Sequence, residues 1–200
     1  ALGFNAEADA DFAVALGGQA LAEGANSTAV GDFATAGAND TVAVGADAAA
    51  IAEDATAIGE NSFAASEGAT AIGEDSVATG FQSTALGENA VASGDNAIAI
   101  GVDIDNNGDG ASAAAAGAIA IGADASAGFE NSVAFGQGAA STRANQVALG
   151  TASNTVTLPG ITSTESASAQ SGPVELVTTD ASGNLASDGG ALQSQVDTNT

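Results

Sequence analysis

The chain of 200 residues lacks cysteine, histidine, methionine, tryptophan and tyrosine, and Arg143 is its single basic residue. Without cysteine there is neither a disulfide framework nor thiol chemistry. Without histidine, lysine or tyrosine, the usual catalytic bases, activated nucleophiles and nitrogen ligands for metals are missing as well. Paired carboxylates can hydrolyse glycosides, but the acidic residues recur at equivalent turn positions and no pair stands apart from them. The composition therefore predicts that this protein is not an enzyme.

The charge is almost entirely of one sign, with 25 acidic residues against one arginine and a formal net charge of −24. Such a density of negative charge repels nucleic-acid phosphates and anionic lipids, so we expect no nucleic-acid partner. Acidic chains are often disordered, but 45% of these residues are hydrophobic and they recur periodically, which favours a folded chain. No apolar run is long enough for a signal peptide or a membrane-spanning helix.

A triplet of alanine, an aliphatic residue or phenylalanine, and glycine recurs at a constant interval of fourteen positions. The copies end at Gly3, Gly17, Gly31, Gly45, Gly59, Gly73, Gly87 and Gly101 and, after one longer step, at Gly122, Gly136 and Gly150. The step from Gly101 to Gly122 exceeds the period by seven positions. A short fixed period means that one structural unit stacks on itself, so the sequence predicts a solenoid rather than a globule with a cleft.

Each repeat contains two segments typical of short β-strands. A β-branched residue, alanine and an aliphatic residue precede the glycine, as in Thr56–Ile58, and a second alanine follows five positions after it, as in Val77–Thr79. Glycine, asparagine, aspartate and glutamate fill the positions between, which indicates tight turns. We therefore expect a coil of two strands and two turns, with successive coils pairing in parallel at about 4.8 Å. A helix is disfavoured, because each glycine would cost it roughly 1 kcal/mol.

The two sides of the first strand differ in size. A two-stranded coil this thin has room only for alanine, so we expect the invariant alanines inside and the larger residues outside, on one continuous stripe. An exposed apolar stripe of that length calls for self-association, most simply a cyclic oligomer about the rod axis. The alternative places the aliphatic residues inside a monomeric solenoid and alanine outside. The stripe comprises Val14, Leu16, Val30, Val42, Val44, Ile58, Ile72, Leu86, Ile98, Ile100, Ile119, Ile121, Val133, Phe135, Val147 and Leu149.

The repeats resemble those of a known family. Residues 26–31 (Asn-Ser-Thr-Ala-Val-Gly) and 131–136 (Asn-Ser-Val-Ala-Phe-Gly) are similar to the head repeat of trimeric autotransporter adhesins, the YadA-like head, and residues 74–80 resemble its second half. The likeness covers residues 1–150. It implies an all-β fold, a left-handed parallel β-roll assembled as a homotrimer at the outer membrane surface of a Gram-negative bacterium. The chain departs from the family in its uniform acidity and in Ala52 and Ser66, which replace second-strand glycines.

The seven extra residues fall in a loop insertion at about residues 102–116. Here Asp103, Asp105 and Asn107 alternate and a glycine follows, as in loops whose oxygen ligands wrap a calcium ion, and Asp109 could add its backbone carbonyl. An EF-hand is not expected, because Ala114 stands where its bidentate acid belongs. The alternative is a polar turn that protrudes without a metal. Calcium is the only cofactor that the sequence suggests.

The periodicity stops after Gly150. Residues 155–160 read as a strand ended by a turn, residues 162–172 as a linker, and residues 174–185 as a β-hairpin around a turn of Asp, Ser, Gly and Asn. We therefore expect a head of residues 1–150, a strand and hairpin connector of residues 151–190, and, from the family resemblance, the start of a coiled-coil neck at residues 191–200.

The resemblance implies an adhesive head that attaches a bacterium to a host, matrix or environmental surface by residues that the repeats do not single out. Membrane association would come only through an anchor that is not among these residues. A purely structural spacer rod is the main alternative, and a calcium-dependent or ice-binding solenoid is a further one. The acids in the turns form either a solvated coat or a cation-binding surface.

Overall fold

The computed structural model describes residues 1–171 and 175–191. The chain divides into two compact units, of which the first is Ala1–Thr155 and the second begins at Val156. The first unit therefore extends five positions beyond the expected boundary at residue 150.

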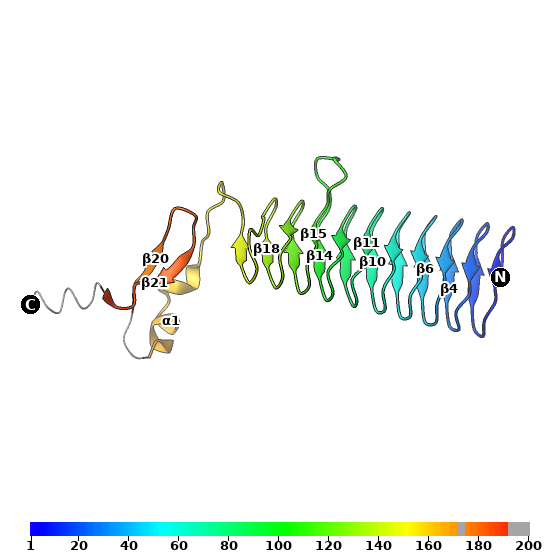
Figure 1. The fold of residues 1–200 in the computed structure, drawn as a ribbon, viewed down its shortest axis with the longest axis horizontal. Coiled ribbons are helices and arrows are strands. Elements are labelled where there is room, and N and C mark those ends of the chain that lie inside the picture. Colours follow the sequence, from blue (N-terminus) through cyan, green and yellow to red (C-terminus); the bar gives the residue numbers. More distant parts are fainter. Residues whose placement is uncertain (172–174, 192–200) are drawn as a thin grey trace, which may run out of the picture. The chain divides into compact units, whose positions relative to one another are not determined.

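The first unit is a stack of two-stranded coils, with one parallel sheet on each side (Figure 1). The ten-stranded sheet, here called sheet A, is made of the strands that precede the glycines. Its strands are β2 (Val14–Leu16), β4 (Thr28–Val30), β6 (Val42–Val44), β8 (Thr56–Ile58), β10 (Thr70–Ile72), β12 (Thr84–Leu86), β14 (Ile98–Ile100), β16 (Ile119–Ile121), β18 (Val133–Phe135) and β19 (Val147–Leu149).

The nine-stranded sheet, here called sheet B, is made of the shorter second strands. These are β1 (Glu7–Ala8), β3 (Leu21–Ala22), β5 (Thr35–Ala36), β7 (Ala49–Ala50), β9 (Phe63–Ala64), β11 (Val77–Ala78), β13 (Val91–Ala92), β15 (Ser112–Ala113) and β17 (Ser126–Ala127). Each strand pairs with its equivalent one coil away, for example Ala71 with Ala85 in sheet A and Ala78 with Ala92 in sheet B. The prediction of an all-β parallel solenoid with one coil per repeat is confirmed.

The interior between the sheets consists of alanine and a few hydroxyl residues. The central alanines of sheet A, from Ala29 to Ala134, and those of sheet B, from Ala22 to Ala127, are 0% exposed. The alternative of an aliphatic interior is wrong, because the gap between the sheets holds nothing larger than serine and threonine beside these alanines.

The buried hydroxyls are bonded mostly within their own turns. Ser27 donates its hydroxyl to the carbonyl of Gly24 at 2.6 Å, and Thr41 does the same to Ala38. Such bonds replace those that the hydroxyls would make with water. Ser83 differs, because its buried Oγ has no hydrogen-bond partner among the described residues.

The glycines that end the strands of sheet A are required by the stacking. Gly59 has φ of +133°, and a β-carbon there would collide with the backbone carbonyl of Gly73 in the next coil. Both conditions favour glycine, since it has no side chain to clash and no penalty at positive φ. The glycine ladder therefore sets how closely the coils can approach.

The turns between the sheets use left-handed backbone conformations. Asp54 and Asn61, which lie in the turns before and after β8, have φ of +59° and +53°. Asparagine and aspartate tolerate this region better than other residues with side chains, which explains their recurrence between the strands. Phe12 and Phe33 occupy the positions equivalent to Asp54 and Asn61, with φ of +61° and +55°, although phenylalanine does not favour this region.

The second unit differs in part from its predicted form. Residues 155–158 contain no strand, and a 3₁₀ turn, η1 (Pro159–Thr162), follows. Helix α1 (Thr164–Ala169) occupies the expected linker, because the side chain of Ser163 caps it by accepting the backbone N–H of Ser166. Strands β20 (Val177–Thr179) and β21 (Leu185–Ser187) pair antiparallel as a hairpin.

Two predictions for the second unit fall on residues that the structure does not describe. Val174, the first residue of the expected hairpin, lies outside the described residues, as does the proposed neck at residues 191–200 except for Ala191. Among the described residues, no helix has the length and apolar character needed to cross a bilayer.

Candidate binding surfaces and the insertion loop

The larger side chains of sheet A point away from the alanine interior and form one apolar face. Each of the ten strands contributes two outward positions, and all of these hold Val, Leu, Ile, Phe or Thr. No charged residue lies among them. All sixteen residues predicted to form an interface are therefore on one side of one sheet, here called the apolar face.

The apolar face remains accessible in the single chain. Leu16, Leu86 and Phe135 are 43%, 42% and 53% exposed, and most of the other outward residues are half-buried by their neighbours in the same row. A continuous apolar surface over ten strands exceeds the scattered exposed residues that soluble monomers usually carry. The geometry is that of a surface which a partner would cover.

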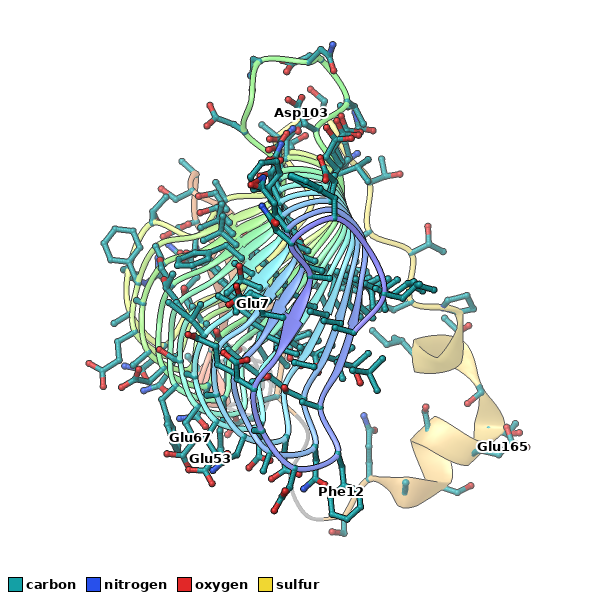
Figure 2. The ribbon with its side chains drawn as sticks, turned by 90° about the vertical axis from the view of Figure 1, so that its right-hand side faces the viewer. Glu7, Phe12, Glu53, Glu67, Asp103 and Glu165 are labelled. Atoms are coloured by element: carbon teal, nitrogen blue, oxygen red, sulfur yellow. The ribbon has the colours of Figure 1, made fainter. Side chains whose placement is uncertain are left out.

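No acidic residue of the first unit lies on the apolar face, and most of them lie in the turns at its two edges. One edge, here called the insertion edge, consists of the turns that lead from sheet A to sheet B, and includes Glu60 and Glu74. The opposite edge consists of the returning turns and includes Glu53 and Glu67, which Figure 2 shows near each other. Like charges are thereby kept off the surface that would be buried in an oligomer, where removing them from water would be costly.

The insertion leaves the coil at Asp103 and returns at Ala111, so the extra residues are 104–110 (Figure 1). Asp103 is only 7% exposed. Its Oδ2 accepts the backbone N–H of Gly108 at 2.6 Å and its Oδ1 accepts that of Asp105 at 3.1 Å. Asn107 accepts the N–H of Asp109 at 2.8 Å, so the loop's polar side chains cap its own backbone.

The hydrogen bonds also control the ionisation of Asp103. Burial by itself raises the pKa of this carboxyl, but the backbone N–H groups of Gly108, Asn106, Asn107 and Asp105 together outweigh that effect and hold its pKa below the ordinary value. Asp103 is thus a carboxylate that organises the base of the loop at neutral pH.

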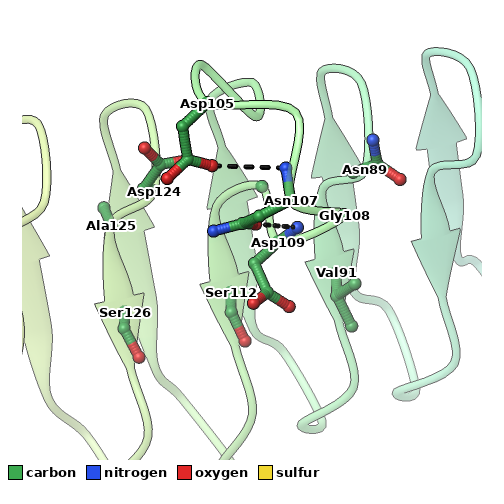
Figure 3. Close-up of a pocket in the computed structure, with 11 residues that line it drawn as sticks. Asn89, Val91, Asp105, Asn107, Gly108, Asp109, Ser112, Asp124, Ala125 and Ser126 are labelled. Carbon is green, nitrogen blue, oxygen red and sulfur yellow. Dashed lines mark hydrogen bonds between the residues drawn. The ribbon is translucent and has the colours of Figure 1, made fainter.

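The loop overhangs the insertion edge and leaves a shallow hollow of about 400 Å³ against sheet B (Figure 3). The wall is formed by Asp105, Asn107 and Asp109 from the loop, and the floor by residues of three coils. The floor residues include Asn89, Val91, Ser112, Asp124 and Ser126. The hollow is open to solvent and its rim is acidic.

The four residues predicted as calcium ligands lie together at the insertion, but the side chains of three of them form hydrogen bonds with the backbone of the loop. Asp103, Asp105 and Asn107 each accept a backbone N–H within the loop. In the described part of the chain, no three His, Cys, Asp or Glu side chains are grouped so as to hold a metal ion. The calcium site therefore stays a prediction, and the loop closes through its own hydrogen bonds.

Several members of this hollow were not among the residues predicted from the sequence, and Asn89 and Asp124 are the two that share a turn position with Asp103. Asn89 and Asp124 hold the turn position of Asp103 in the coils on either side of the insertion. The repeat register was the signal that could have found them. Asp124 contacts the loop, since its Oδ1 accepts the backbone N–H of Ile104 at 3.4 Å.

The model of the YadA head domain repeat matches residues 1–20, 22–48, 50–76, 78–103, 113–139 and 130–153, which is more than half of the chain. The chain belongs to the YadA head family. Residues 104–112, which include the insertion of residues 104–110, are not covered by any YadA head match, so this loop is an addition to the family repeat.

A solved structure described as the crystal structure of the collagen-binding domain of Yersinia adhesin YadA is similar over 97% of this chain and 79% of that chain. The two are 21% identical, and the TM-score is 0.33. No curated protein sequence matches the chain. Membership of the YadA head family thus rests on the repeats themselves.

Proposed function

We propose that this chain is the head of a trimeric autotransporter adhesin, displayed at the outer membrane surface of a Gram-negative bacterium and attaching it to a host, matrix or environmental surface. The observation that carries the proposal is the charge-free apolar face of sheet A in a chain of the YadA head family. Three copies would bury this face around a common axis and leave the acidic edges and sheet B in water. No catalytic role is proposed.

Sedimentation equilibrium of the purified chain tests the assembly. A mass three times that of the 18.6 kDa chain supports the proposal. A monomer over the micromolar range contradicts it, because the apolar face would then be stable in water without a partner.

Attachment is tested with beads that carry the purified trimer. Beads coated with an unrelated acidic protein of similar net charge serve as the control for charge alone. Collagen is included among the surfaces because the solved Yersinia domain is described as collagen-binding. Retention of the trimer beads above the control supports the adhesive role. A trimer that is retained on no cell, matrix or mineral surface supports instead the spacer, whose uniform coils need no ligand.

We further propose that the insertion takes up calcium through Asp103, Asp105, Asn107 and Asp109. Support comes from the alternating oxygen side chains and the glycine that follows them. Calorimetric titration of calcium compares the chain with a triple variant, Asp103→Asn, Asp105→Asn and Asp109→Asn. The matched control, Asp32→Asn, Asp47→Asn and Asp54→Asn, loses the same charge elsewhere. Equal binding by both variants contradicts the site.

A further inference from the structure

The outer face of sheet B is not a repeat of the apolar face. Its outward residues change in character along the unit. The first coils carry acids, with Glu7 on β1 and Glu23 next to β3, beside Leu21 on β3 and Thr35 on β5, and the last strands, β15 and β17, carry serine. Between them, the first residue of each strand from β7 to β13 is apolar. We call these four residues, Ala49, Phe63, Val77 and Val91, together with the exposed Ile51 that follows β7, the sheet B strip.

The sheet B strip is accessible. Ile51 is 45% exposed, and Phe63, Val77 and Val91 are half-buried by their neighbours in the row. Gly37, one coil before Ile51, leaves a notch between the Ile51 side chain and the carboxylate of Glu23: a β-carbon at Gly37 would lie 3.7 Å from Ile51 Cγ2 and 3.7 Å from Glu23 Oε2. The notch brings an apolar group and a carboxylate within the reach of one side chain.

Acidic side chains border the sheet B strip along both edges. On the insertion edge the same coils carry Glu60, Glu74 and Glu88 at one repeated turn position. On the opposite edge Glu53 and Glu67, both labelled in Figure 2, occupy equivalent positions one coil apart. Successive coils that pair as parallel strands are spaced by about 4.8 Å. The strip is therefore a narrow, mainly apolar floor between two rows of carboxylates, with Thr79 and Ser93 as the polar residues of its second outward row.

The width of the floor selects the ligand. The two outward positions of one strand lie roughly 7 Å apart. The distance from any point of the floor to the nearer row of carboxylates is therefore no greater than about the length of one lysine side chain. Lysine and arginine lay their aliphatic stems on apolar surfaces and extend the charged group to the polar border. A purely apolar ligand would leave the carboxylates unused, and a compact cation would leave the floor unused.

Charge excludes the other obvious occupants. A second copy of this chain would bring its own acidic borders against these, since the chain has one basic residue and 25 acidic ones. Nucleic acids and anionic membranes meet the same repulsion. We propose that the sheet B strip and its two acidic borders bind an extended polypeptide segment rich in lysine or arginine. The proposal rests on the adhesive role and deepens it by naming the surface and the class of ligand.

The direct test is fluorescence anisotropy with a labelled twelve-residue peptide of alternating lysine and alanine. We expect saturable binding by the purified chain that weakens as salt is raised. The variant Glu53→Gln with Glu67→Gln removes two carboxylates of the opposite edge and should bind about five- to tenfold more weakly. Its matched control, Glu130→Gln with Glu165→Gln, loses the same charge outside the strip and should bind as the unaltered chain does.

A second variant examines the floor. Ile51→Ser leaves the charge unchanged and removes apolar surface on which a stem would pack, so it should weaken binding about two- to fivefold. Thermal melts of all these variants should match that of the unaltered chain, because the substituted side chains are exposed. If both pairs of Glu→Gln substitutions weakened peptide binding equally, the peptide would be responding to the overall negative charge of the chain and not to the sheet B strip. That result would overturn the proposal. An unaffected Ile51→Ser chain, or no binding of the peptide by the unaltered chain, would also overturn it.

The experiments distinguish a failure of the adhesive role from a failure of the basic-segment site on sheet B. If Glu53→Gln with Glu67→Gln leaves bead attachment intact while abolishing peptide binding, the adhesive role stands and its ligand lies elsewhere, which contradicts this assignment. If the unaltered trimer attaches to no surface yet binds the peptide as expected, the adhesive role fails and the basic-segment site on sheet B stands.

Discussion

Asp103 Oδ2 accepts the backbone N–H of Gly108 across the base of the insertion at 2.6 Å. The bond links the start of the insertion to a residue within it, and the family repeat does not contain this loop. It joins a buried carboxylate to an exposed residue of the loop, so the ionisation of one side chain is coupled to the shape of the whole protrusion.

Acid should open the insertion. The pKa of Asp103 is lower in the folded chain than its ordinary value of 3.8, so its ionised form stabilises the fold above that value. This contribution is lost as the pH falls below about 4 and through the folded pKa. Hydrogen exchange of the Gly108 amide should therefore accelerate at low pH relative to amides of the coil strands. Asp103→Asn should show fast exchange already at neutral pH, whereas Asp95→Asn on the opposite edge should leave it slow. Equal Gly108 exchange in both variants would contradict the role of Asp103.

Replacing a stacking glycine should weaken the solenoid. Gly59→Ala introduces a β-carbon at φ of +133° that collides with the Gly73 carbonyl, and we expect a loss of about 2–5 kcal/mol in the free energy of unfolding. Gly128→Ala is the control, because a β-carbon there meets nothing within 4 Å. Chemical denaturation followed by circular dichroism measures both. Similar stabilities for the two variants would show that the coils can shift apart at little cost.

Replacing a phenylalanine that is held in the left-handed backbone conformation should stabilise the fold. Phe33 holds φ of +55° with a half-exposed side chain, so Phe33→Asn should stabilise the chain by about 0.5–1 kcal/mol. Phe81 also lies in a turn, with 40% of its side chain exposed, but outside the left-handed region. Phe81→Asn should therefore bring no gain. The midpoint of thermal unfolding measures both, and a loss of stability in Phe33→Asn would mean that its ring makes contacts that outweigh the backbone strain.

A charge on the apolar face should prevent assembly while sparing the fold. Ile58 is 37% exposed, so Ile58→Asp leaves a hydrated carboxylate on the single chain but buries three of them in a trimer. We expect a monomer by sedimentation equilibrium. Ser93→Asp adds the same charge beside β13 of sheet B, where the residue is exposed, and should remain trimeric. A trimer of Ile58→Asp would place the interface elsewhere.

Much of the head could be predicted because the same local constraint, the small space inside each coil, recurs in every repeat. Alanine must lie inside a coil this thin, as Ala71 and Ala85 do, so the larger residues of the same strand, such as Ile72, must lie outside. The second unit has no such repetition. There the sequence predicted a linker where Ser163 caps helix α1, since a single capping side chain decides the conformation of a short polar segment.

In the insertion loop, too, one part of the arrangement could be predicted from the sequence and another part could not. Alternating Asp103, Asp105 and Asn107 indicated a turn with oxygen side chains, but spacing does not say what the oxygens bind. In the folded chain these side chains accept backbone N–H groups of other loop residues. Asp124, from a neighbouring coil, accepts the backbone N–H of Ile104 in the same loop.

By itself, the sequence determined the period, the parallel pairing, the separation of alanine from aliphatic residues and the family, because each depends on the same few residues recurring in register. Only the tertiary structure decided which residues of the turns, of the insertion and of the outer face of sheet B share a surface. Stacking in three dimensions places Glu53 beside Glu67, Asp124 beside the insertion and the outward residues of sheet B in a strip between acidic borders. The repeat register aligns equivalent positions of successive coils, but the directions in which the side chains of the turns and of the inserted loop point are not specified by the order of residues along the chain.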